Sequence, residues 1–168
     1  MTEKYAPEIE RKYLIAYPDI DWLCANAERS HIVQTYLTGD NYTTARVRMR
    51  EWQDRCVYYY TEKRHISAVT KMEYEKEVSR EEYERLLERE DRERKPVIKD
   101  RYCLTFEAQL FEIDVYPFYT DRAIMEIELA SEEQEIIFPP QITILKEVTG
   151  DRRYSNASMA KKVPYDEL

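Results

Sequence analysis

Charged and apolar residues alternate along several segments of the chain, and a period of two is typical of β-strands. In an extended backbone, residues two apart share a face. In the segment 8–15, the charged face holds Glu8, Glu10 and Lys12. The opposite face holds Ile9, Tyr13 and Ile15, with Arg11 as its charged exception. The pattern predicts a strand that buries one face and presents ions on the other.

Six further segments repeat this arrangement. Their charged faces carry Arg46, Arg48 and Arg50; Lys63; Lys71, Glu73, Glu75 and Glu77; Lys99 and Arg101; Glu112 and Asp114; and Glu126 and Glu128. Charged side chains usually lie in solvent, so a sheet with a wet ionic face is the simplest interpretation. In a closed barrel, one set of faces would instead form the lumen. Acids and bases cluster on separate strands, with acids on the first and the last, and this separation favours the barrel.

Helix signals are few. Residues 19–30 follow Pro18 and place apolar residues at helical spacing, so we expect a helix that ends close to His31. Ser79–Glu82 and Ser131–Gln134 both fit the capping-box pattern, and another short helix is expected near Ser155. We expect His65 in a loop, with a structural or solvated side chain. The helices could cover the apolar outer faces of a barrel.

Composition sets the class of protein. The chain has 168 residues, 43% of them hydrophobic and 36% charged, which suits one globular domain over residues 1–168. We expect no membrane association, because no run approaches the roughly 18 apolar residues of a membrane span. Three cysteines, an odd number, and the lack of a signal peptide indicate reduced thiols and a cytoplasmic protein. The net charge of -8 argues against nucleic-acid binding.

Glycine and histidine are scarce, and this excludes several kinds of site. With two glycines, the chain cannot form a glycine-rich phosphate loop or a dinucleotide fingerprint. With two histidines, it has no spacing that supports a zinc site. Any bound phosphate must therefore be held by arginine and lysine side chains.

The two kinds of ionic strand suit one kind of ligand. Carboxylates such as Glu8, Glu10, Glu126 and Glu128 suit a hard divalent cation, Mg²⁺ or Mn²⁺. Clustered arginines and lysines suit phosphate oxygens. A phosphate chain bound together with a metal ion satisfies both, and the reaction that follows is hydrolysis or transfer at phosphorus. A lumen lined only by structural salt bridges is less favourable, because each buried ion costs several kcal/mol unless it is well paired.

Several motifs in order resemble the CYTH superfamily of triphosphate tunnel metalloenzymes. The hallmark is an E-x-E-x-K strand, here formed by Glu8, Glu10 and Lys12. The resemblance runs from about residue 8 to residue 160. It includes Gln34-Thr35-Tyr36-Leu37, Arg48-Met49-Arg50, Thr61-Glu62-Lys63, Glu73-Tyr74-Glu75, Lys99-Asp100-Arg101-Tyr102, Phe111-Glu112-Ile113-Asp114-Val115, Met125-Glu126-Ile127-Glu128, Glu147-Val148-Thr149 and Arg153-Tyr154-Ser155-Asn156.

The resemblance implies an α+β fold, an eight-stranded antiparallel β-barrel or tunnel with a charged lumen and helices packed on the outside. It implies metal binding by Glu8, Glu10, Glu126 and Glu128. It assigns the phosphate chain to Lys12, Arg48, Arg50, Lys63, Lys99 and Arg101. Tyr36 would lie close to Lys12 as a proton partner, so these two are the expected catalytic residues. Arg46 shares the face of Arg48 but lies outside the motif.

The activity implied by the resemblance is Mg²⁺- or Mn²⁺-dependent hydrolysis of inorganic tripolyphosphate. Within the superfamily, class IV adenylate cyclase and thiamine triphosphatase are alternatives. A non-catalytic module that binds polyphosphate or nucleotide is an alternative from another class. A homodimer through the apolar outer faces also stays open, since helices could cover those faces instead.

Overall fold

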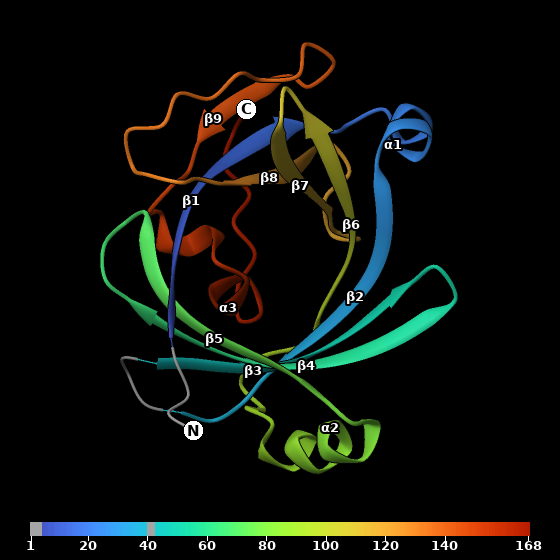
Figure 1. Ribbon diagram of the computed structural model, residues 1–168, viewed down its shortest axis with the longest axis vertical. Coiled ribbons are helices and arrows are strands. Elements are labelled where there is room, and N and C mark those ends of the chain that lie inside the picture. The colour runs from blue at the N-terminus through green and yellow to red at the C-terminus, as the bar shows by residue number, and fades with distance from the viewer. Residues whose placement is uncertain (1–4, 40–42) are drawn as a thin grey trace.

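A computed structural model of the protein describes residues 5–39 and 43–168 (Figure 1). Nine strands and a few short helices make up this part of the chain. The strands are β1 (Ala6–Ala16), β2 (Glu28–Tyr36), β3 (Thr43–Trp52), β4 (Arg55–His65), β5 (Thr70–Val78), β6 (Val97–Phe106), β7 (Gln109–Val115), β8 (Arg122–Glu128) and β9 (Ile144–Glu147). The helices are α1 (Ile20–Asn26), α2 (Arg80–Leu86), α3 (Asn156–Met159) and the 3₁₀ turns η1 (Leu87–Arg89) and η2 (Arg152–Tyr154).

Eight antiparallel strands close into a barrel, as the resemblance implied. The strands follow the order β5-β4-β3-β2-β6-β7-β8-β1, and pairing of β1 with β5 closes the circle. One edge of β1 pairs with β8 over β1 residues 10–16. The other edge pairs with β5 over residues 6–9 and with β9 over residues 13–15, so β9 extends the sheet beside β5. The two-residue turns 53–54 and 107–108 join β3 to β4 and β6 to β7 with positive φ angles throughout. Such turns match the right-handed twist of the paired strands.

Two apolar clusters cover the outside of the barrel. The larger one includes Tyr13, Ile15, Phe111, Ile113 and Met125, and α1 packs on it through Leu23. The other includes Val47, Val78 and Tyr83, and it attaches α2 to the outer face of β3 to β5 (Figure 1). These two helices lie where the sequence placed them. The Ser79 hydroxyl caps α2 by accepting a hydrogen bond from the backbone N–H of Glu82, as the capping box predicted.

A third cluster closes one end of the lumen. It contains Leu14, Tyr36, Tyr116, Ile124 and Tyr154, and it includes Met159 of α3. α3 therefore lies within the opening of the barrel, and not on its outside as expected (Figure 1). The Tyr116 hydroxyl donates to Asn156 Oδ1 at 2.6 Å, which fixes the start of α3 inside the barrel. The prediction of a helix near Ser155 is confirmed, since the Ser155 hydroxyl caps α3.

The predicted end of the first helix and the predicted loop at His65 are both wrong. α1 ends at Asn26, and residues 28–36 form β2, so Ser30 and His31 are strand residues. His31 lies opposite Asp100 of β6, and its Nδ1 is 2.8 Å from Asp100 Oδ1. Pairing with β6, joined from His31 by pairing with β3, outweighs the weak helical preference of this short stretch. His65, expected in a loop, is the last residue of β4.

The second predicted capping box, Ser131–Gln134, does not begin a helix. The Gln134 side chain instead accepts a hydrogen bond from the backbone N–H of Ala130 at 2.7 Å. Ile136 and Phe138 both pack against the larger outer cluster. Two residues two apart reach the same surface only from an extended backbone, so their burial opposes a helix here. No helix in the described part of the chain is long and apolar enough to cross a membrane.

Candidate active site

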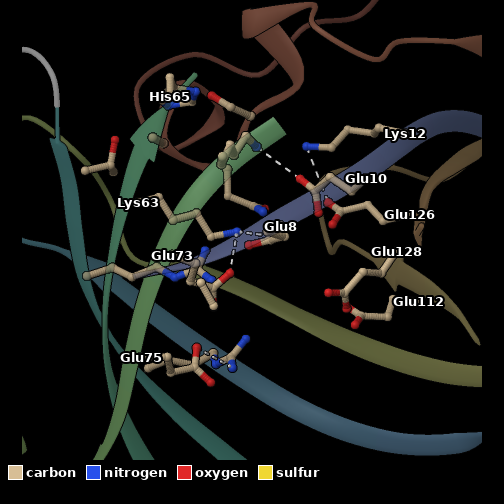
Figure 2. Close-up of a pocket in the computed structure, with 18 of the residues that line it drawn as sticks. Glu8, Glu10, Lys12, Lys63, His65, Glu73, Glu75, Glu112, Glu126 and Glu128 are labelled. Carbon is tan, nitrogen blue, oxygen red and sulfur yellow. Dashed lines mark hydrogen bonds and ion pairs between the residues drawn. The ribbon is translucent and has the colours of Figure 1, made fainter. Parts of the chain in front are cut away.

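The lumen holds a cavity of about 490 Å³ that is lined mostly by charged side chains (Figure 2). Acids come from β1, β5, β7 and β8, and bases come from β1, β3, β4, β5 and β6. The acids are Glu8, Glu10, Glu73, Glu75, Glu112, Glu126 and Glu128. The bases are Lys12, Arg46, Arg48, Lys63, Lys71 and Arg101, with His65 beside them. The charged faces predicted from the period of two therefore do line the inside of a barrel.

Antiparallel register places the acids of β1 beside those of β8. Glu10 lies directly opposite Glu128, and Lys12 lies opposite Glu126. Glu126 is in turn opposite Glu112 of β7. Side chains directly opposite each other on one face have Cβ atoms about 4.5–5.5 Å apart. Closure of the barrel thus joins carboxylates that are more than 100 positions apart in the sequence.

Lysine ammonium groups pair with the acids of β1 and β8 (Figure 2). Lys63 Nζ lies 3.1 Å from Glu8 Oε1 and 3.7 Å from Glu73 Oε2. Lys71 Nζ lies 3.0 Å from Glu10 Oε1. Lys12 Nζ lies 3.4 Å from Glu126 Oε1 and donates to the carbonyl of Tyr154 at 3.1 Å. The positive and negative sets therefore neutralise each other across the cavity.

The carboxylates differ in how strongly they hold a proton. Burial, with the nearby charges of Glu126 and Glu8, raises the pKa of Glu10 to about 7. Burial and Glu112 raise the pKa of Glu128. Burial would also raise the pKa of Glu126, but Lys12 and Arg101 outweigh it, and that pKa lies well below its usual value. At neutral pH, Glu126 is ionised and Glu10 is part protonated.

The arginines of β3 form a row along the lumen. Arg48 Nη2 is 3.5 Å from Glu75 Oε2, which also accepts a hydrogen bond from Thr61 at 2.9 Å. Burial and the adjacent Arg46 lower the pKa of Arg48 to about 10. Tyr36 of β2 lies directly opposite Arg46, and both line the cavity. Arg48 stays charged at neutral pH, so the row is a fixed source of positive potential.

Lys99, Arg101 and Asp114 form a buried ionic group at the side of the cavity. Asp114 is fully buried and accepts from Lys99 Nζ at 2.7 Å, from Arg101 Nε at 2.7 Å and from Arg101 Nη2 at 2.9 Å. Burial and Arg101 lower the pKa of Lys99 to about 7, although Asp114 opposes that change. Arg101 also pairs with Glu112 at the cavity wall. Asp114 thus fixes the guanidinium of Arg101.

The structure brings most of the predicted site residues together. All four predicted metal ligands line the cavity, as do Lys12, Tyr36, Arg48, Lys63 and Arg101. Lys99 and Arg50 do not belong to the cavity wall. Lys99 is 1% exposed and directed to Asp114, and the guanidinium of Arg50 lies 5.3 Å from the ring of Trp52. That Lys99 and Arg50 contact a substrate stays a prediction.

Some residues that line the cavity were not predicted from the sequence. His65 lines it, and burial with the nearby charge of Lys71 lowers its pKa. His65 is two residues from Lys63, so the period of two could have identified it. Ser155, Asn156 and Ala157 line the cavity from the start of α3. No sequence signal indicated that this segment enters the barrel.

The side chains as they stand hold no ready-made metal site. Within residues 5–39 and 43–168, no three histidine, cysteine, aspartate or glutamate side chains form a group that could hold a metal ion. The three cysteines in these ranges are free thiols. The carboxylates of the cavity are instead paired with lysines, and one oxygen, Glu8 Oε2, is buried without a hydrogen-bond partner among the described residues.

Comparison with known proteins gives one consistent answer. The CYTH domain family matches residues 6–155. An inorganic triphosphatase from Nitrosomonas europaea is 31% identical over 160 residues, covering 94% of this chain and 99% of that protein. An inorganic triphosphatase from Acetivibrio thermocellus is 32% identical over 163 residues, covering 94% and 95% of the two chains. The crystal structure of the inorganic triphosphatase NE1496 superposes with a TM-score of 0.57 at 31% identity, covering 94% of this chain and 97% of that one. The chain therefore belongs to the CYTH family.

Proposed function

We propose that this protein hydrolyses inorganic tripolyphosphate to pyrophosphate and phosphate, with Mg²⁺ or Mn²⁺ as its cofactor. The observation that carries the proposal is that carboxylates of β1 and β8 face cations of β3, β4 and β6 within one cavity. The carboxylates are complementary to a divalent cation, and the lysines and arginines are complementary to a polyanion. The relatives named as inorganic triphosphatases support the same choice of substrate.

The donor set fits a hard divalent cation. Glu8, Glu10, Glu126 and Glu128 offer only carboxylate oxygens, which Mg²⁺ and Mn²⁺ prefer. Glu8 Oε2 is a buried acceptor that a cation would satisfy. These four residues would hold the ion, which would supply positive charge against the phosphate oxygens. The raised pKa of Glu10 means that the ion would compete with a proton at neutral pH.

The lysines and arginines would bind the phosphate chain by exchanging partners. Lys63, Lys71 and Lys12 now neutralise Glu8, Glu10 and Glu126. A phosphate chain would draw these ammonium groups away and so release the carboxylates for the metal ion. Arg48 and Arg101 would add bidentate contacts that orient the chain. This exchange couples the binding of substrate to the binding of metal without leaving a buried charge unpaired.

Tyr36 and Lys12 are the proposed catalytic residues. Both line the cavity, and Lys12 also reaches the backbone of Tyr154 at 3.1 Å. The ammonium group of Lys12 would stabilise the charge that develops on the transferred phosphoryl group. The hydroxyl of Tyr36 would hold or pass a proton beside it.

The lining favours an inorganic chain over a nucleotide. Tyr36 is the one tyrosine, phenylalanine or tryptophan that lines the cavity in the described part of the chain, and it belongs to the buried cluster at its end. A base or a thiazole ring would need an aromatic face on which to stack. The observed lining offers charged groups in its place.

A substrate panel tests the proposal. We expect phosphate release from tripolyphosphate with Mg²⁺ or Mn²⁺ to exceed release from ATP and from thiamine triphosphate by at least tenfold in kcat/KM. EDTA should abolish it. Cyclic AMP formation from ATP would identify a cyclase instead. Tight binding of tripolyphosphate without turnover under either metal would show a non-catalytic binding module and overturn the enzyme proposal.

Replacing Lys63 and Lys99 separately should distinguish a residue of the cavity wall from a buried one. Lys63→Met removes an ammonium group from the cavity, so we expect KM for tripolyphosphate to rise at least tenfold. Lys99→Met removes an ammonium group that is bound to Asp114, and Asp114 keeps both contacts to Arg101. We expect its KM to change less than threefold. Steady-state kinetics checks both, and an equal rise in the two variants would show that Lys99 reaches the substrate.

A further inference from the structure

A buried glutamine on β2 has unpaired polar atoms. The side chain of Gln34 is 0% exposed, and neither its Nε2 nor its Oε1 has a hydrogen-bond partner in the part of the chain that the structure describes. Burying an amide without partners is unfavourable, because both atoms lose their hydrogen bonds to water. Gln34 lies behind the cavity wall, beside residues that line it, and a buried residue of this kind points to a role in binding.

Of the two residues directly opposite Gln34 on the neighbouring strands, one is polar. It lies on the same face of β2 as Tyr36, which lines the cavity. Across one edge of β2 its partner is Val97 of β6, a member of the apolar cluster that closes the lumen. Across the other edge its partner is Arg48 of β3. Gln34 and Arg48 are therefore side by side on the inner face of the barrel.

Arg48 has the complementary unpaired atom. Its Nη2 makes one long contact, 3.5 Å, to Glu75, while its Nε is buried without a partner among the described residues. The Nε atoms of Arg46 and Arg50 on either side are also buried and unpaired in this part of the chain. A guanidinium group has only donors, so these arginines cannot satisfy one another. The amide oxygen of Gln34 is the acceptor that the register places next to Arg48.

We infer that Gln34 is a positioning residue for Arg48 in phosphate binding. When a phosphate group draws the Nη atoms of Arg48 away from Glu75, Gln34 Oε1 accepts a hydrogen bond from Arg48 Nε. The guanidinium plane is then fixed, with both Nη atoms directed at phosphate oxygens in the bidentate manner of arginine. The inference rests on the proposed function, since it takes Arg48 as a phosphate ligand.

Gln34→Met tests this role, because methionine fills nearly the same volume and has no strong acceptor. We expect the Kd for tripolyphosphate, measured by calorimetry in EDTA, to rise about tenfold. KM should rise by a similar factor, with kcat changed less than twofold. The melting temperature should be unchanged or higher, since an unpaired buried amide is removed. Thr35→Val is the matched control: Thr35 is buried on the opposite face of β2, and its replacement should leave Kd unchanged.

A double-mutant cycle with Arg48→Lys separates positioning from a structural role. Lysine lacks the Nε–H group of a guanidinium, so it cannot make the proposed hydrogen bond to Gln34 Oε1. Gln34→Met should therefore change Kd less than twofold in the Arg48→Lys protein. Equal effects in both backgrounds, or wild-type affinity in Gln34→Met, would overturn the inference. Gln34→Asn, which withdraws the amide by one methylene, serves the same cycle if the methionine variant does not fold.

The double-mutant cycle compares Kd values, so it tests the role of Gln34 even if the protein does not hydrolyse tripolyphosphate. Wild-type protein that binds tripolyphosphate without hydrolysing it would overturn the proposed activity and leave the role of Gln34 to be decided by Kd. Wild-type protein that binds tripolyphosphate neither in EDTA nor with Mg²⁺ would overturn both.

Discussion

Replacing Glu10 with glutamine should abolish metal-dependent hydrolysis and also stabilise the metal-free protein at pH 8. Glu10 is one of the four carboxylates proposed to hold the metal ion, and an amide oxygen is a weaker ligand for a hard cation. We expect kcat to fall at least a hundredfold. Added Mn²⁺ should raise the melting temperature of the wild-type protein and leave that of Glu10→Gln unchanged.

The gain in stability follows from the pKa of Glu10. The pKa is about 7 in the folded protein, above the 4.5 of a free glutamate, because burial and the charges of Glu126 and Glu8 oppose ionisation. The folded state therefore binds the proton more tightly, and stability falls as the pH rises from about 4.5 to 7. Above pH 7 the full penalty applies, at about 1.4 kcal/mol for each unit of pKa difference. Loss of the contact to Lys71 offsets part of this gain.

Melting temperatures at two pH values test the predicted direction of the stability change in Glu10→Gln. At pH 8 we expect Glu10→Gln to unfold about 2–4 °C higher than wild type, equivalent to about 1 kcal/mol in a chain of this length. At pH 4, below the pKa of Glu10 in both the unfolded and the folded state, the difference should be close to zero. Glu77→Gln is the control, since Glu77 lies on the same strand face as Glu75 but is exposed outside the cavity. Full activity of Glu10→Gln at low Mg²⁺ would contradict the metal assignment.

The sequence predicted the faces of the strands better than their depth in the barrel. A period of two placed Glu8, Glu10 and Lys12 on one side, and all three line the cavity. The same period placed Lys99 beside Arg101, but Lys99 is 1% exposed and lies behind the cavity wall. Alternation fixes the face to which a side chain belongs. Its position along the barrel axis depends on strand tilt and register, which emerge only when all the strands have paired.

Segments whose structure depends on distant partners were the hardest to predict. Residues 28–31 carry no strong strand signal, and they become part of β2 because β6 pairs with them along one edge, while β3 joins the other edge from His31 onward. Ser155 was correctly predicted as a helix start, yet nothing local indicates that α3 enters the lumen. Its position depends on Tyr116, whose hydroxyl donates a hydrogen bond to Asn156, 40 residues later in the chain. The local sequence pattern therefore predicts that α3 forms, whereas its position inside the barrel depends on tertiary contacts.

Replacing Asp114 with asparagine should cause the largest loss of stability of any single change considered for this protein. The Asp114 carboxylate is 0% exposed and holds Lys99 and Arg101 through three hydrogen bonds of 2.7–2.9 Å. Asparagine fills the same space, but it leaves Lys99 without its counter-ion and Arg101 with Glu112 alone. Breaking a buried ion pair from one side costs about 3–5 kcal/mol, so we expect the melting temperature to fall by roughly 10 °C. Thermal unfolding at pH 7 measures this loss.

A second replacement shows whether unpaired charge is the cause. Lys99→Met in the Asp114→Asn background removes one of the two cations, so it should restore at least half of the lost stability. The loss in Asp114→Asn should also be smaller at pH 9 than at pH 6. The pKa of Lys99 is already lowered to about 7 in the wild-type fold, below the 10.5 of a free lysine. Without Asp114 it falls further, so the unfolded state binds more protons and stability rises with pH.

Glu112→Gln is the matched control for Asp114→Asn, because Glu112 also pairs with Arg101 but has a side chain that is 30% exposed. Solvent screens its charge, and we expect a loss of less than about 1 kcal/mol. Equal destabilisation by the two variants would overturn the idea that burial of the Asp114 charge sets the size of its effect. A large difference, with recovery in the double variant, would show that one buried carboxylate holds Arg101 at the cavity wall while keeping Lys99 charged behind it.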